Sequence, residues 1–144
     1  MLHNIYSAVL CVTLLGLAGC GGAQADPLQR VAVTGKVTLD TKPIDEGAIS
    51  FVPVDGGTAA TASGGVITAG EYQIPQESGL AAGNYRVVIT SPEPGPKRSG
   101  DDLMNNPGPP RKERVAAKYN LKSELQAAIK AGAPNKFDFA VTSK

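Results

Sequence analysis

The alternation of side chains in residues 31–40 constrains the fold of this chain more than any other feature. One face of this stretch carries Val31, Val33, Gly35, Val37 and Leu39, and polar residues or alanine lie between them. Successive side chains of a strand point to opposite faces, so the pattern predicts a half-buried β-strand. Further short β-rich runs follow along the chain, separated by turn residues. The expected fold class is therefore all-β.

Four more strands are expected between residues 47 and 90. Residues 47–54 form a β-rich run that follows a turn at 40–43, which predicts a hairpin with the first strand. Residues 66–68 and 71–75 flank Ala69-Gly70 and predict a second, shorter hairpin. The alternation in residues 84–90 predicts a further strand, whose inner face carries Tyr85.

Residues 123–132 fit two structures. A serine cap, good helix formers and a terminal glycine favour a helix. Alternation of Leu125, Ala127 and Ile129, followed by a turn at 132–135 and further alternation in 137–141, favours a closing hairpin. We favour the hairpin, with the helix as the alternative for residues 122–130.

The spacing Leu80-x-x-Gly83-x-Tyr85 resembles a tyrosine corner. In that arrangement the phenol hydroxyl bonds to backbone a few residues upstream and holds a loop of a β-sandwich. We expect a structural role for Tyr85, with its hydroxyl bonded near Ala81.

The N-terminal segment predicts export and lipid attachment. Residues 5–18 are mostly apolar but shorter than the roughly 20 residues of a membrane-spanning helix, which is typical of a signal peptide. The residues Leu17-Ala18-Gly19-Cys20 that follow resemble the lipobox of bacterial lipoproteins. The resemblance implies that the Cys20 thiol receives a diacylglycerol and that the chain is cut before it. Gly21 after the cysteine is similar to the outer-membrane class.

The expected organisation follows from these segments. Residues 1–19 are the lipoprotein signal peptide, 20–29 the lipidated cysteine and a flexible tether, and 30–144 the β-sandwich domain. Residues 91–113 contain six prolines and few apolar residues, so they predict a Pro-rich insertion outside the sheet. An insertion of this length is uncommon unless it is functional or disordered.

Composition excludes most catalytic chemistry. The 14 Lys and Arg nearly balance the 13 Asp and Glu, which argues against nucleic acid as a partner. His3 is the only histidine, and Cys11 and Cys20 are the only cysteines. After cleavage the chain would have no imidazole and no free thiol for a hydrolase triad, a zinc site or a disulfide. The oxygen ligands in residues 101–106 do not match a calcium-loop spacing. We expect no enzyme activity, no cofactor and no metal.

Five segments of the chain carry a further resemblance, namely residues 33–44, 48–53, 83–89, 118–120 and 135–139. Together they resemble the transthyretin-like, carboxypeptidase-regulatory-like domains of bacterial lipoproteins. The resemblance implies an antiparallel Greek-key β-sandwich of seven or eight strands. Such domains accompany an enzyme or decorate a cell surface, and they bring no catalytic residues to this chain.

The expected function is that of a non-catalytic, lipid-anchored envelope protein that serves as a structural or interaction module. Its expected partners are the membrane, through the N-terminal lipid, and an envelope protein or polysaccharide. The alternative is an accessory lipoprotein that binds carbohydrate or a small ligand, with Tyr72 and Tyr119 as the candidate exposed aromatic residues. Candidate partner contacts are Arg111, Lys112, Arg114 and Tyr119.

Overall fold

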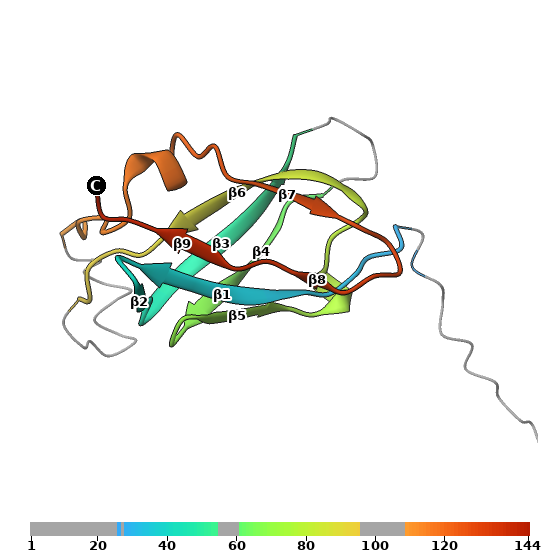
Figure 1. Cartoon of the computed structure of the whole chain (residues 1–144), viewed down its shortest axis with the longest axis horizontal. Helices are drawn as coiled ribbons and strands as arrows, with labels where there is room; N and C mark the ends of the chain where they lie inside the picture. Colours follow the sequence, from blue (N-terminus) through green and yellow to red (C-terminus); the bar gives the residue numbers. More distant parts are fainter. Residues whose placement is uncertain (1–25, 27, 55–60, 96–108) are drawn as a thin grey trace, which may run out of the picture.

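The structure, a computed structural model, describes residues 26, 28–54, 61–95 and 109–144. It confirms an all-β fold, with nine strands and two short 3-10 helices in these ranges (Figure 1). The elements are β1 (Val33–Leu39), β2 (Lys42–Pro43), β3 (Glu46–Pro53), β4 (Ser63–Thr68), β5 (Glu71–Ile74), η1 (Gln76–Ser78), β6 (Gly83–Thr90), η2 (Ala117–Tyr119), β7 (Gln126–Ile129), β8 (Asn135–Lys136) and β9 (Phe139–Val141). Within the described ranges, no helix has the length and apolar character needed to cross a bilayer.

All nine strands belong to one curled sheet, where the sequence predicted a sandwich of antiparallel strands. The order is β2-β1-β5-β4-β3-β6-β7, and β8 and β9 add to the remaining side of β1. Neighbouring strands are antiparallel except at β1, which pairs in parallel with β8 and β9. The register aligns Val33 with Asn135 and Val37 with Phe139. In this view β9 crosses in front of β3 (Figure 1).

The predicted hairpin between the first strand and residues 47–54 is wrong. β3 pairs with β4 and β6, and β1 pairs instead with the two-residue β2. Asp40 and Thr41 both adopt positive φ angles, 48° and 71°, which produce a tight turn and return the chain to β1 at once. The predicted hairpin of β4 and β5 is present, with Ala69 and Gly70 at positive φ in its turn.

The C-terminal segment is a strand, as favoured, but it does not close a hairpin. β7 pairs with β6, and β8 and β9 pair with β1. The side chain of Asn135 bonds to both backbone groups of Lys130, so a hairpin partner cannot use them. Gly35 allows the C-terminal strand to approach β1, because a Cβ there would lie 1.8 Å from the Phe137 carbonyl oxygen.

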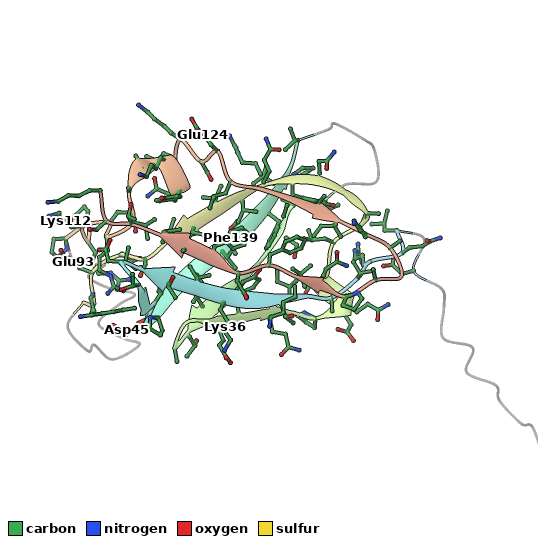
Figure 2. All side chains as sticks on the ribbon, in the orientation of Figure 1. Lys36, Asp45, Glu93, Lys112, Glu124 and Phe139 are labelled. Carbon is green, nitrogen blue, oxygen red and sulfur yellow. The ribbon has the colours of Figure 1, made fainter. Side chains whose placement is uncertain are left out.

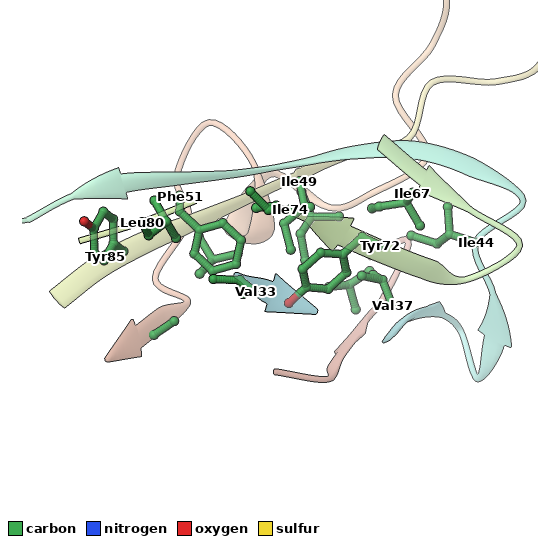
Figure 3. Packing of buried hydrophobic residues seen from close by; sticks show 14 of the residues in the cluster. Val33, Val37, Ile44, Ile49, Phe51, Ile67, Tyr72, Ile74, Leu80 and Tyr85 are labelled. Atoms are coloured by element: carbon green, nitrogen blue, oxygen red, sulfur yellow. The ribbon is translucent and has the colours of Figure 1, made fainter. Parts of the chain in front are cut away.

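The core consists of the inward-facing side chains of the strands together with Ile44, Leu80 and Val115 from the connections (Figure 3). Val33 and Val37 of β1 are fully buried, whereas Lys36 between them is exposed, as predicted (Figure 2). The other fully buried large side chains are Ile44, Ile49, Phe51, Ile67, Ile74, Leu80, Tyr85, Val87, Ile89 and Val141. Burial of each aliphatic side chain contributes about 1.5–3 kcal/mol, so this cluster stabilises the curled sheet.

Tyr85 lies in this core with no exposed surface. Its hydroxyl donates a hydrogen bond of 2.9 Å to the carbonyl oxygen of Ala81, the bond that the spacing predicted. Burial raises the pKa of the Tyr85 phenol, which therefore remains a protonated donor.

The N-terminal end of the domain and the ends of the insertion lie at opposite ends of the molecule (Figure 1). Asp26 accepts hydrogen bonds from the backbone of Leu28 and Arg30, and Val31 then bridges to Leu80. At the other end, β6 finishes at Thr90 and leads to residues 91–95. The eight residues of β6 span roughly 26 Å at about 3.3 Å per residue.

Candidate interaction site

The two ends of the Pro-rich insertion form a paired stem beyond β6. Pro92 and Glu113 form an antiparallel bridge, and the Glu93 N–H donates to the Lys112 carbonyl at 2.8 Å. The Arg114 N–H donates to the Ser91 carbonyl at 3.1 Å. Glu93 and Lys112 lie at the same end of the molecule as Asp45 (Figure 2). The stem therefore has a defined position relative to the sheet.

Arg114 connects this stem to the sheet. Its Nη2 donates to the Ser91 Oγ at 2.6 Å, and its Nε donates to the Ser91 carbonyl at 3.3 Å. The Ser91 hydroxyl in turn donates to the Glu46 carbonyl at 2.6 Å. Asp45 Oδ2 lies 3.8 Å from Arg114 Nη1. The guanidinium thus makes its contacts within the domain, and we interpret Arg114 as a residue that positions the stem.

Glu113 also stabilises the stem, through its side-chain carboxylate. Its Oε1 accepts hydrogen bonds from the backbone of Ser91, at 2.7 Å, and of Val115, at 3.0 Å. Alternate residues face different grooves here. Glu113 and Val115 line one groove, and Arg114 lines another with Asp45.

The chain after the stem forms a turn with many hydrogen bonds. The N–H of Lys122 donates to the Ala117 carbonyl at 2.8 Å, and that of Ser123 to the Asn120 carbonyl at 3.0 Å. The buried side-chain amide of Asn120 donates to the Val115 carbonyl at 3.0 Å. The Ser123 hydroxyl donates to the Val87 carbonyl of β6. These bonds attach residues 117–123 firmly to the sheet.

Leu121 points into solvent from this turn. It is 91% exposed, more than Val66 at 68% and Val54 at 53%, the other exposed large hydrophobic residues of the described ranges. Burial of a leucine would contribute about 1.5–3 kcal/mol. The isolated domain does not gain this free energy, whereas a complex in which a partner covers Leu121 would gain it.

An apolar groove of about 410 Å³ lies beside Leu121, and we call it the Leu121 groove. Its lining comes from the outer face of β6 and from residues 113–121. The lining residues are Val88, Thr90, Glu113, Val115, Ala117, Asn120 and Leu121. A convex apolar side chain and a concave apolar surface thus lie next to each other. This arrangement is typical of a protein interface.

The residues next in sequence to the lining of the Leu121 groove are mostly cationic. Residues 109–124 contain five cations, Arg111, Lys112, Arg114, Lys118 and Lys122, against the two carboxylates of Glu113 and Glu124. All of these cations except Arg114 are exposed. The remainder of the chain is therefore slightly acidic, because the whole chain has a formal charge of only +1.

The structure distributes the predicted contact residues unequally. Arg111 and Lys112 are exposed on the stem, and Arg114 is bonded within the domain. Tyr119 is half-buried against the core, with the Lys118 Nζ 5.1 Å from its ring centroid. Its face is thus already occupied by a cation.

Tyr72 is not the exposed aromatic residue that the sequence analysis nominated. It is 4% exposed, and its hydroxyl donates to the Phe137 carbonyl at 2.9 Å. Burial, and to a smaller extent the charge of Asp138, raises the pKa of the Tyr72 phenol far above its ordinary value. Tyr72 faces inward because β5 alternates in register with β1.

The predicted signal peptide and the predicted lipidation of Cys20 lie outside the described residues, as do residues 101–106, whose spacing does not match a calcium loop. In the part of the chain that the structure describes, no group of three or more His, Cys, Asp or Glu side chains could hold a metal ion.

Sequence reasoning identified the cations but missed Leu121, Val88 and Ala117. Leu121 stands between Asn120 and Lys122 in a stretch without a clear period, so no pattern marked it. One feature of the sequence could have predicted its exposure. A leucine with polar neighbours on both sides belongs to no local apolar face.

No family model and no curated protein matches the chain. Among solved structures, it is similar to a protein from Bacteroides ovatus described as a "putative adhesin" in a 3.00 Å crystal structure. The identity is 15%, the TM-score is 0.37, and the match covers 84% of this chain and 48% of that one. The chain thus spans about half the length of that protein. So distant a likeness carries no argument about function.

Proposed function

We propose that this protein is a non-catalytic, lipid-anchored module of the bacterial envelope that binds a partner through the Leu121 groove. The observation that carries the proposal is the 91% exposure of Leu121 on a hydrogen-bonded turn beside an apolar groove. A contiguous exposed apolar surface marks an interaction site, and Leu121 is continuous with the apolar groove that it lines.

The rigidity of the turn supports this function. Binding normally costs free energy because loops and side chains become ordered at the interface. Here the bonds of Asn120 and Ser123 already order the turn before a partner arrives. Leu121 is therefore preorganised to act as an interface anchor, of the kind that contributes most of a binding energy.

The proposed anchor is the lipid on Cys20. The described domain begins at the end of the molecule opposite to the stem of the insertion (Figure 1), and the proposed tether would join that end to the lipid. An outer-membrane or periplasm-facing anchor at that end would direct the Leu121 groove away from the membrane. Two or three acyl chains are enough for stable attachment, since each buried methylene contributes about 0.8 kcal/mol.

Site-specific photo-cross-linking in cells tests the binding function. A benzophenone amino acid replaces Leu121 in one variant and Val66 in a control variant, because both side chains are exposed. We expect a discrete light-dependent adduct from position 121 and none of the same mass from position 66. Absence of an adduct at 121, or the same adducts from both positions, would contradict the proposal.

A polar groove favours a second function, binding of a carbohydrate or another small polar ligand. It has a volume of about 610 Å³ and lies over β1, β4, β5 and β8. Its polar lining residues are Thr34, Lys36, Thr68, Glu71, Tyr72, Gln73 and Lys136. Isothermal titration with soluble peptidoglycan fragments tests this function. Binding that Gln73→Ala abolishes and Gln126→Ala preserves would support it.

A further inference from the structure

We infer that the partner of the Leu121 groove is an acidic polypeptide segment that carries at least one apolar side chain between its carboxylates. The inference rests on the proposed function and names the class of partner. Three properties of the site lead to it: its shape, its charge and its place on the molecule.

The shape of the site calls for a partner with side chains of its own. The Leu121 groove is a concave surface between Val88 of β6 and Ala117 of η2, and Leu121 projects next to it. A protruding apolar side chain can fill the groove while Leu121 enters a depression on the partner. The volume of about 410 Å³ accommodates one or two large side chains. A polysaccharide, which is hydroxylated throughout, would leave this apolar lining unmatched.

The charge around the groove selects acidic flanks. Arg111 and Lys112 precede the lining residue Glu113, Lys118 follows Ala117, and Lys122 follows Leu121. Glu113 is the one carboxylate in the lining, its Oε1 is bonded to two backbone N–H groups, and the four exposed cations outnumber it. Carboxylates beside an apolar anchor would therefore lie near the exposed cations that adjoin the groove lining in sequence.

The same charge argues against a second copy of this chain. Self-association about a two-fold axis would bring the cationic rim of one copy against that of the other, which is repulsive. The position of the site argues against the membrane that holds the proposed anchor. The groove is lined by the end of β6 and by residues 113–121. These segments lie toward the end of the molecule opposite to the start of β1 (Figure 1). A flat lipid surface would also leave a concave groove unfilled.

Fluorescence anisotropy with synthetic peptides tests the inference on the purified full-length protein. The probe is a short fluorescein-labelled peptide with a Leu-Leu pair flanked by glutamates. One comparison peptide has glutamine at every glutamate, and another has serine at both leucines. We expect the acidic peptide to bind at least about tenfold more tightly than either comparison at low salt, and to lose affinity as salt screens the charges.

Matched variants locate the binding. Leu121→Ser should weaken binding of the acidic peptide by about tenfold or more, as loss of one buried leucine implies. Val66→Ser, a change of an exposed apolar residue outside the groove, should leave it unaltered. Reversal of charge at the rim, in Lys118→Glu with Lys122→Glu, should weaken binding, whereas Lys130→Glu at the other end of the domain should not.

Equal affinity for the glutamate and glutamine peptides would overturn the inference. So would Leu121-dependent sedimentation with phosphatidylglycerol vesicles when the acidic peptide does not bind, because the partner would then be a lipid surface. The cross-linking experiment separates this failure from that of the proposed function. An adduct at position 121 without preference for the acidic peptide removes only the partner class.

Discussion

The side chain of Asn135 bonds to both backbone groups of Lys130, in the manner of a neighbouring strand. Asn135 Oδ1 accepts from the Lys130 N–H at 2.9 Å, and its Nδ2 donates to the Lys130 carbonyl at 2.9 Å. The Nδ2 also donates to the Ala133 carbonyl at 2.9 Å. One side chain thus links the end of β7 to β8 and connects two edges of the curled sheet.

Asn135→Ala should destabilise the domain by about 1–3 kcal/mol, because it removes three hydrogen bonds from a residue that is only 6% exposed. Urea denaturation measures the change. Lys136→Ala, at an exposed neighbouring position, is the control and should alter the free energy of unfolding by less than about 0.5 kcal/mol. Equal effects would show that the side-chain bridge does not stabilise the fold.

Gly35→Ala should lower the stability by about 1–3 kcal/mol or more, the usual range for overpacking. The added Cβ would lie 1.8 Å from the Phe137 carbonyl oxygen and 2.8 Å from the Tyr72 hydroxyl. The C-terminal strand would have to move away from β1. Thermal unfolding compared with Thr34→Ala, at the adjacent position of β1, provides the measurement. An unchanged melting temperature would mean that β8 and β9 do not pack closely on β1.

Val37→Asp should unfold the domain, since an unpaired charge in a fully buried position costs several kcal/mol of a total of about 5–15. Lys36→Asp is the control at the opposite face. It replaces the exposed ion pair of Lys36 and Glu71, at 3.1 Å, with a repulsion worth at most about 1 kcal/mol. Circular dichroism during heating distinguishes the two. Similar stabilities would refute the assignment of faces in β1.

Tyr85→Phe should cost about 1 kcal/mol through loss of the hydrogen bond to Ala81, and it should leave partner binding unaltered. Tyr119→Phe serves as the comparison for the free energy of unfolding, because that ring packs at the edge of the core. A change in affinity for the acidic peptide in Tyr85→Phe would indicate a role in the site and contradict a purely structural one.

Cys20→Ser should release the protein from the membrane fraction or leave it as an unprocessed precursor, because Cys20 is the proposed acylation site. Cys11→Ser changes the other cysteine of the chain and should leave fractionation as in the wild type. Membrane fractionation with immunoblotting gives the result. A Cys20→Ser protein that stays with the membrane at its mature size would exclude lipidation.

Local pattern predicted the strands and their buried faces well. Val33 and Val37 are buried, Lys36 is exposed, and residues 126–129 form a strand where a helix also fitted the sequence. The bond from Tyr85 to Ala81 also followed from spacing, because it joins residues four positions apart. In each case the determining geometry is the period of two along an extended chain, or a short stretch of backbone.

Pairing and exposure were decided by the tertiary structure. Alternation states which side chains face the core but not which edge a strand joins, so it could not predict that Phe139 pairs with Val37, about a hundred positions away in the sequence, in parallel. Neither could it predict Leu121. That side chain is exposed because Asn120 and Ser123 bond to Val115 and Val87 and orient the turn outward. The sequence by itself determined a two-faced β chain with cations near residue 115. Long-range backbone hydrogen bonds, which depend on how the sheet curls, placed those cations beside an apolar groove.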